Sequence, residues 1–156
     1  AVIKGAAFGG GVGLISCCDI ALASENSIFS LSEVKVGLIP ATISPYVINA
    51  IGARNARRLF TSGERFDSNI AKQINLVHEI AKEEDLEKRI SYFINHFKQN
   101  GPQAVIAAKK IVLDIFNKEI DDSVISHTCE VISALRTSKE GREGVTAFLE
   151  KRNPNW

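Results

Sequence analysis

The sequence predicts an α/β fold in which short strands alternate with helices and a run of helices follows. Two observations support this prediction. Residues 1–80 contain short apolar runs separated by segments rich in glycine, serine or proline, the pattern of short buried strands and helices. Residues 81–156 contain long stretches with helical periodicity. The arrangement is an α/β layer followed by a helical extension.

Residues 1–80 are expected to contain four strands and three helices. Strands are expected at residues 1–3, 19–24, 28–31 and 76–80, with a loop of small residues over 4–11. Helices are expected at residues 12–18, 45–60 and 67–74. Asp67 is suited to the N-cap of the third helix.

Residues 81–156 are expected to be helical in three stretches. The stretches are residues 83–99, 102–117 and 121–152. Pro102 follows Gly101 and suits the first turn of a helix. Gly141 and Gly144 are expected to break the last stretch into two helices.

The composition excludes several classes of protein. Hydrophobic residues make up 45% of the 156 residues and charged residues 24%, which excludes a disordered tail and a collagen-like fibre. A net charge of +1 gives no electrostatic argument for nucleic acid or an anionic membrane surface. No apolar run approaches the ~20 residues of a membrane-spanning helix. We therefore expect neither a nucleic acid nor a membrane as a partner.

The cysteines and the missing methionine bear on location and completeness. Three cysteines cannot all pair, and Cys17 and Cys18 are neighbours. Reduced thiols in the cytoplasm or an organelle matrix are therefore expected. The sequence has no methionine and opens as a strand already in progress. We expect it to be the later part of a longer protein.

Three consecutive glycines, residues 9–11, lie between an expected strand and an expected helix. Glycines let a ligand approach the backbone closely, and free N–H groups at a helix start attract negative charge. The residues that follow fit neither the phosphate loop nor the dinucleotide fingerprint, whereas an oxyanion site needs only well-aimed N–H groups. The alternative is a tight turn whose glycines allow close packing.

Glu33 is the second candidate functional residue. It follows an expected strand and precedes an apolar stretch that ends at Pro40. A carboxylate in such a place is suited to proton transfer near neutral pH, and the alternative is a solvated glutamate at a strand end. His78, His96 and His127 show no metal-ligand spacing, so no metal site is expected.

Four segments resemble a known family. They are GAAFGGGVGLISCCDIALA (5–23), IFSLSEVKVGLIP (28–40), ARRLFTSGERFDSNIAKQINLVHEI (56–80) and the closing EGVTAFLEKRNPNW. In this order and spacing they resemble the enoyl-CoA hydratase/isomerase (crotonase) superfamily over essentially the whole chain. The segment LSEVKVGLIPATISPYV (31–47) is most similar to the methylglutaconyl-CoA hydratase branch of bacterial leucine and isoprenoid catabolism.

The resemblance implies a fold and an assembly. Residues 1–80 would be the C-terminal part of a spiral core of ββα units that carries the oxyanion loop and the acid/base glutamate. Residues 81–156 would be a helical region used for trimerisation and for closing the acyl-CoA pocket. The N-terminal part of the family fold would be absent. The implied partners are an acyl-CoA substrate and further copies in a homotrimer or hexamer, with no cofactor.

The resemblance also assigns roles to residues. The Gly10 N–H would be one of two oxyanion donors to the thioester carbonyl, and Glu33 would act on the α and β carbons of the acyl group. Lys151 would lie near the nucleotide phosphates, although an amphipathic end helix is an equal alternative for Phe148 and Lys151. The implied substrate-binding residues are Gly9, Gly11, Gly13, Pro40, Phe148 and Lys151.

Gly13 departs from the family pattern, because a second glutamate is expected there. Paired glutamates hold the water that a hydratase adds across the α,β double bond. We expect an enoyl-CoA hydratase in which Glu33 serves both roles, or in which the second carboxylate comes from elsewhere or from the substrate. One alternative is a 3,2-enoyl-CoA isomerase, which needs a single base. Another is a non-catalytic acyl-CoA-binding homologue.

Overall fold

Two small sheets organise the first part of the chain. In the computed structural model, which describes residues 1–156, β1 (Val2–Ile3), β3 (Leu22–Ser24) and β6 (Glu79–Ala81) form one parallel sheet in the order β1-β3-β6. The other sheet contains β2 (Ala6–Phe8), β4 (Ile28–Ser30) and β5 (Arg65–Asp67), in the order β2-β4-β5. There β2 and β4 are parallel, and β4 and β5 are antiparallel. The first four strands alternate between the two sheets.

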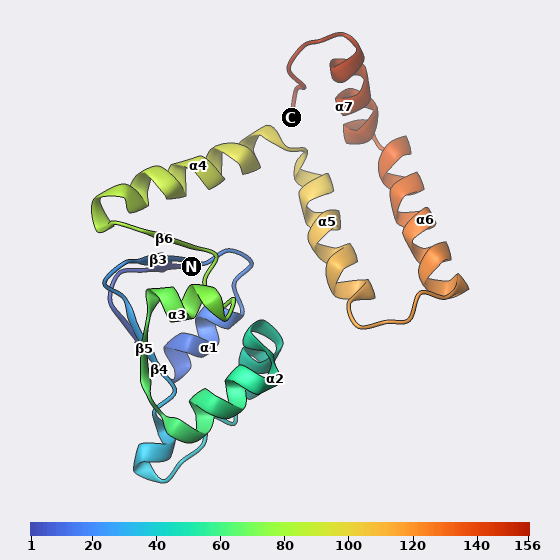
Figure 1. The fold of residues 1–156 in the computed structure, drawn as a ribbon. Helices are drawn as coiled ribbons and strands as arrows, with labels where there is room; N and C mark the ends of the chain where they lie inside the picture. Colours follow the sequence, from blue (N-terminus) through green and yellow to red (C-terminus); the bar gives the residue numbers. More distant parts are fainter. The chain divides into compact units, whose positions relative to one another are not determined.

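Three helices and one 3₁₀ turn complete this part. α1 (Gly10–Ser16) packs against α2 (Ser44–Ser62), and the turn η1 (Glu33–Val36) contacts α2 as well (Figure 1). α3 (Ser68–Gln73) follows β5, and Asp67 caps it as predicted by accepting the Ile70 N–H at 2.9 Å. Within α2, Gly52 has φ 76° and ψ 154°, so two helical stretches meet there.

The core lies between the sheets and these helices. Apolar side chains from all of them are buried together, and the rings of Phe29 and Phe66 stack with centroids 5.5 Å apart. Buried serines link the strands: Ser27 Oγ donates to the Ile3 carbonyl at 3.0 Å, and Ser68 Oγ donates to the Ser24 carbonyl at 2.6 Å. The hydroxyls are thus satisfied inside the core, which removes the penalty for burying them.

The chain divides into two units, Ala1–Ile90 and Ser91–Trp156. The turn η2 (Glu83–Asp85) leads into α4 (Leu86–Gln99), which begins in the first unit. Leu86 is buried there, and Arg89 donates to both carboxylate oxygens of Glu79 at 2.8 Å. These hydrogen bonds lower the pKa of Glu79. The division between the two units falls after these contacts.

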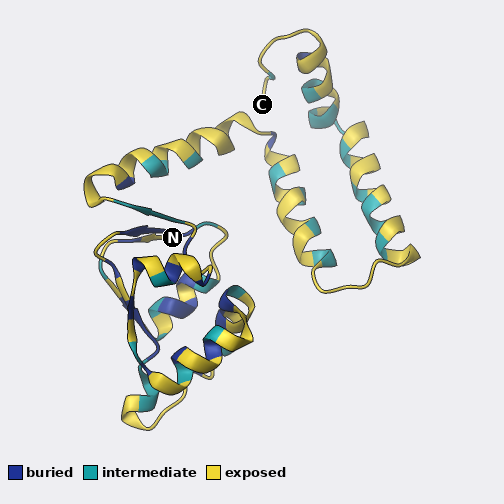
Figure 2. Cartoon of the chain, viewed as in Figure 1, coloured by how far each residue is buried: buried dark blue, intermediate teal, exposed yellow.

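The second unit is helical. After the end of α4 it contains α5 (Pro102–Ile115), α6 (Asp122–Thr137) and α7 (Lys139–Leu149), and each of these three contacts the other two. Little of this unit is buried (Figure 2). Ala147 is its one buried hydrophobic side chain. No helix of the chain has both the length and the apolar character that a membrane crossing requires.

Several expectations about local structure were wrong. The strand β5 was not expected, and β6 begins at Glu79 and not at residue 76. The expected loop over residues 4–11 contains β2, in which Ala7 is buried opposite Phe29. Gly141 and Gly144 do not break a helix but lie inside α7. The break is at Ser138, which adopts an extended conformation and caps α7 by accepting the Gly141 N–H at 3.0 Å. A Cβ at Gly141 would collide with the Leu135 carbonyl, so this glycine permits close packing of α6 and α7.

Candidate active site

Gly9 and Glu33 meet because they follow neighbouring parallel strands. Gly9 comes directly after β2, and Glu33 opens η1 shortly after β4. The Gly9 N–H continues the β2–β4 ladder by donating to the Ser30 carbonyl at 2.9 Å. Both residues therefore lie at the carboxyl ends of adjacent strands, the place where open α/β sheets bind ligands.

The turn at Gly9 requires glycine because of its backbone conformation. Its φ of 49° with ψ of −114° is a conformation that side chains disfavour. A Cβ there would also lie 3.0 Å from Glu33 Oε1. The Gly9 carbonyl accepts the N–H groups of Val12 and Gly13, at 2.9 and 3.2 Å, which fixes the start of α1. The glycine thus brings the backbone against the glutamate.

Gly10 is the first residue of α1 and is exposed. An amide at this position has no acceptor within its own helix. Apart from its chain neighbours and the backbone of its own helix, no atom lies within 4 Å of the place where a Cβ on Gly10 would stand. Beside Gly11, in contrast, Ala7 Cβ lies 3.6 Å from the Cβ position. The Gly10 amide makes no backbone hydrogen bond to a loop or strand.

The carboxylate of Glu33 has one buried oxygen without a partner. Oε2 is buried and accepts no hydrogen bond, and it is the one side-chain nitrogen or oxygen of the chain in that condition. An unsatisfied buried carboxylate oxygen costs free energy, and such groups in native proteins call for an explanation such as a catalytic role. The solvated glutamate considered from the sequence does not describe this oxygen.

Gly13 lies one turn into α1 and is buried. A Cβ there would collide with the side chain of Ile43, whose own Cβ lies 2.7 Å away. Ile43 precedes α2 and packs against the core. Sequence analysis missed Ile43, because nothing in the local pattern relates residues 13 and 43. The signal lies in the packing of α1 against α2.

Pro40 is buried and lines an apolar pocket of about 410 Å³. Val34, the residue after Glu33, also lines it, together with residues of the following loop and of α2: Ile39, Ala41, Ser44, Ile48, Phe60 and Thr61. The pocket is next to η1, but Glu33 is not among its lining residues. The predicted contact of Pro40 with substrate stays a prediction.

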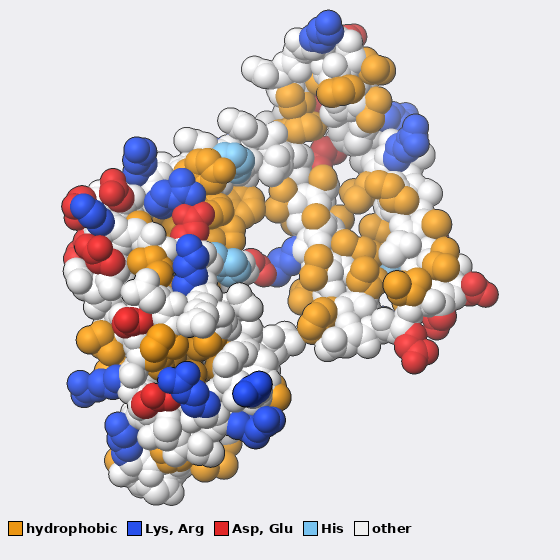
Figure 3. Space-filling model, in the orientation of Figure 1, with side chains coloured by type: hydrophobic (Ala, Val, Ile, Leu, Met, Phe, Trp, Pro, Cys, Tyr) orange, Lys and Arg blue, Asp and Glu red, His pale blue; other side chains and the backbone are white.

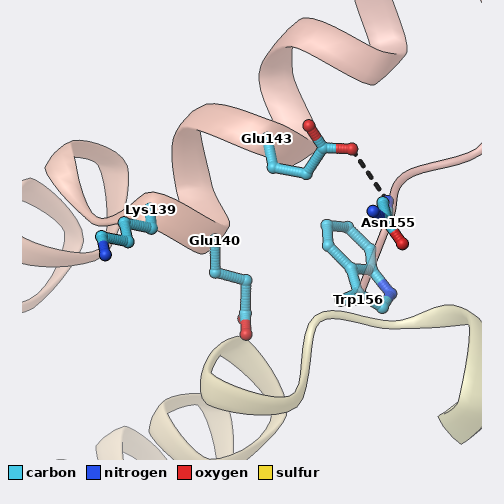
Figure 4. A pocket seen from close by; sticks show the side chains of 5 residues that line it. All are labelled: Lys139, Glu140, Glu143, Asn155 and Trp156. Atoms are coloured by element: carbon cyan, nitrogen blue, oxygen red, sulfur yellow. Dashed lines mark hydrogen bonds between the residues drawn. The ribbon is translucent and has the colours of Figure 1, made fainter.

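Phe148 and Lys151 belong to the second unit. Phe148 is 81% exposed on α7, and Lys151 follows the helix with a positive φ of 55°. The segment after them is anchored to α7. Arg152 donates to both Glu143 oxygens, at 2.6 and 3.0 Å. The Asn155 N–H also donates to Glu143, at 2.8 Å (Figure 4). These hydrogen bonds lower the pKa of Glu143 to about 2.

The three histidines have partners within the fold. His78 Nδ1 accepts the Ala21 N–H at 3.0 Å, between β3 and β6. His96 Nδ1 lies 2.8 Å from the Tyr92 carbonyl, and His127 Nε2 lies 3.2 Å from Asp114 Oδ2. No group of three or more histidine, cysteine, aspartate or glutamate residues is placed to hold a metal ion.

The chain as a whole is similar to known proteins. A family model described as enoyl-CoA hydratase/isomerase matches residues 1–156. The chain belongs to the enoyl-CoA hydratase/isomerase family. An enoyl-CoA hydratase from Shewanella pealeana is 45% identical, with a TM-score of 0.93 over 99% of this chain and 58% of that one. This likeness agrees with the predicted crotonase-type α/β fold with a helical C-terminal region.

Two relatives show how far the family likeness extends. An enoyl-CoA hydratase of Alternaria alternata is 33% identical over 100% of this chain and 53% of its own length. A crotonyl-CoA hydratase of Syntrophomonas wolfei is 27% identical over 100% of this chain and 60% of its own length. The chain thus spans between half and two thirds of the length of these family members.

Proposed function

We propose that the protein is an enoyl-CoA hydratase that adds water across the α,β double bond of an acyl-CoA thioester. The supporting observation is the carboxylate of Glu33, which packs against Gly9 and has one buried oxygen without a partner. A base must reach the reacting atoms and keep an acceptor for the proton it removes. Glu33 Oε2 meets the second condition, and the amide of Gly10 lies in the next residue of the same turn.

The reaction uses these two groups as follows. The thioester carbonyl accepts a hydrogen bond from the Gly10 N–H, which stabilises the negative charge that develops on its oxygen. Glu33 takes a proton from water while the water oxygen forms a bond to the β carbon. The π electrons then form an enolate. Glu33 returns the proton to the α carbon, so the carboxylate is regenerated and one water has been added.

A 3,2-enoyl-CoA isomerase is the second candidate, and the packing at Gly13 favours it. Ile43 occupies the space in which a second carboxylate would stand. Glu33 is therefore the one carboxylate that can transfer protons beside Gly9. A shift of the double bond requires removal of one proton and its return at another carbon, with no bound water. The two relatives, an enoyl-CoA hydratase and a crotonyl-CoA hydratase, favour hydration.

A non-catalytic acyl-CoA-binding protein is less well supported. That function would leave Glu33 free to turn to solvent, whereas its Oε2 is buried. We further propose that copies of the chain assemble through the helical unit, whose exposed apolar side chains include Leu113, Phe116, Ile120, Ile132, Phe148 and Leu149. Location in the cytoplasm and membership of the methylglutaconyl-CoA branch stay predictions.

Hydration by the full-length protein is measured as loss of the absorbance of the conjugated enoyl thioester. Crotonyl-CoA and 3-methylglutaconyl-CoA are supplied to the wild type, to Glu33→Gln and to Glu25→Gln, an exposed glutamate of the same unit. We expect Glu33→Gln to lower the rate by ~10²–10⁴-fold, with an unchanged circular dichroism spectrum, and Glu25→Gln to retain activity. Full activity of Glu33→Gln would refute the mechanism. Conjugation that appears from a 3-enoyl-CoA, without any hydration, would instead identify an isomerase.

A further inference from the structure

The contact between Gly13 and Ile43 is closer than any side chain at residue 13 allows. Gly13 lies in α1, and Ile43 lies at the start of α2. A Cβ added to Gly13 would be 2.7 Å from Ile43 Cβ, and nearer still to its Cγ2. Contacts under 3.0 Å are essentially never seen for real Cβ atoms. Ile43 must therefore move before residue 13 can carry a side chain of any kind.

This contact is one helical turn from Gly9, which lies beside the candidate acid/base. Gly9 connects the two places, because a Cβ on it would lie 3.0 Å from Glu33 Oε1 and its carbonyl accepts the Gly13 N–H at 3.2 Å. Beside Gly9 is a carboxylate with an unpartnered oxygen. Beside Gly13 is a branched hydrocarbon side chain, which neither donates nor accepts hydrogen bonds.

We propose that Ile43 is a specificity-determining residue that limits this site to one carboxylate and keeps water away from the Gly13 side. The proposal rests on the proposed function and deepens it. With Ile43 in place, a water at the site has Glu33 alone as acceptor, and proton transfer between two carbons competes with hydration. Ile43 thus sets the ratio of hydration to double-bond shift.

Three variants of the full-length protein test this role. Ile43→Ala removes the hydrocarbon that fills the space. Gly13→Glu adds a carboxylate whose side chain overlaps that of Ile43. The double variant Gly13→Glu/Ile43→Ala removes this overlap. Ile28→Ala, a partly exposed isoleucine in β4 of the same unit, is the matched control. For each variant, the rates of crotonyl-CoA hydration and of the double-bond shift in a 3-enoyl-CoA are measured as a function of pH.

The expected results distinguish a specificity role from a merely structural one. Ile43→Ala raises the ratio of hydration to double-bond shift by about threefold or more, because water gains access, while Ile28→Ala leaves the ratio unchanged. The double variant hydrates at least about tenfold faster than Ile43→Ala, since a general acid or base contributes ~10²–10⁴-fold when well placed. Its pH profile for kcat gains a second ionisation. An unchanged ratio in Ile43→Ala, or a folded double variant with the wild-type pH profile and rate, overturns the proposal.

A thermal-unfolding series separates this proposal from the proposed function. Gly13→Ala alone is expected to lower Tm by at least about 4 °C, because overpacking forces neighbours to shift. In the Ile43→Ala background, Gly13→Ala is expected to lower Tm by less than half of the fall that it causes in the wild type. Equal falls in both backgrounds would disprove the packing conflict, whatever the activity. If the coupling is found but no variant acts on enoyl-CoA, the proposed function fails instead.

Discussion

The two units of the chain differ in where their apolar side chains lie. All but one of the buried hydrophobic side chains belong to Ala1–Ile90, and the exception is Ala147 in the second unit. The helices of Ser91–Trp156 instead leave large apolar side chains in contact with solvent, such as Phe116 at 54% and Phe148 at 81% exposure. Figure 3 shows hydrophobic side chains at the surface of α5 and α6.

The two units therefore use their apolar side chains differently. In the first unit the apolar side chains form a core that fixes the strands and the turn at Gly9. In the second unit polar contacts supply much of the order, including the caps at Asp121 and Ser138 and the hydrogen bonds of Glu140 to the start of α5. Exposed apolar side chains of this kind are the ones that the proposed assembly of copies through this unit would cover.

The largest expected contrast comes from truncating one phenylalanine in each unit. Phe29→Ala should lower the free energy of unfolding by about 3–5 kcal/mol, because it leaves a cavity in the core. Phe116→Ala should change it by no more than about 0.5 kcal/mol in a dilute monomer, since the ring is already half exposed. Urea unfolding followed by circular dichroism measures both. Equal losses would show that the second unit has a core of its own.

Helix caps provide a smaller contrast between the units. Asp67 accepts the Ile70 N–H at 2.9 Å at the start of α3, and Asp121 accepts the Val124 N–H at 2.9 Å at the start of α6. Each cap is worth about 1 kcal/mol to its helix. Asp67→Ala should lower the global free energy of unfolding by this amount, because α3 packs on the core. Asp121→Ala should mainly raise the hydrogen exchange of the first turn of α6. A purely local effect in both variants would contradict the comparison.

The smallest expected effect is a pH response confined to the second unit. The pKa of Glu143 is about 2 in the folded chain, against an ordinary value of 4.5, because Arg152 and the Asn155 N–H donate to it. A lowered carboxylate pKa stabilises the folded form above the unfolded value, and this contribution is lost as pH falls from about 4.5 to about 2. The segment that ends at Trp156 should therefore loosen within that range.

Fluorescence of Trp156, the one tryptophan of the sequence, measures this response. Arg152→Ala should move the midpoint to higher pH, because the main cause of the lowered pKa is removed. A Lys139→Ala variant, which leaves the hydrogen bonds of Glu143 in place, is the control. A midpoint that does not move in Arg152→Ala would mean that another group controls the segment.

Local sequence patterns predicted the parts of the structure that local chemistry determines. Asp67 as a cap and the glycine turn before α1 were both placed from a few neighbouring residues. The break at Ser138 was missed, because the glycines at 141 and 144 are used for close approach to Leu135 and to Trp156. β2 was missed since its alanines become a strand only through pairing with β4.

The candidate site shows the same limit of local patterns. Glu33 and Gly10 were named from the sequence, with the help of the family resemblance, and their roles stay predictions. The contact of Glu33 with Gly9 depends on the parallel pairing of β2 and β4. The contact of Gly13 with Ile43 depends on how α1 packs against α2. Neither contact has a signal within a short stretch of sequence.

Gly52, where the two stretches of α2 meet, limits which mutations the gene can tolerate at this position. Its φ of 76° with ψ of 154° lies in a region that is essentially restricted to glycine, where other residues cost about 1–3 kcal/mol. All glycine codons share their first two bases, so every change at either base replaces the residue. In a mutational scan, position 52 should therefore have no neutral amino-acid replacement within one nucleotide, although its surface is exposed.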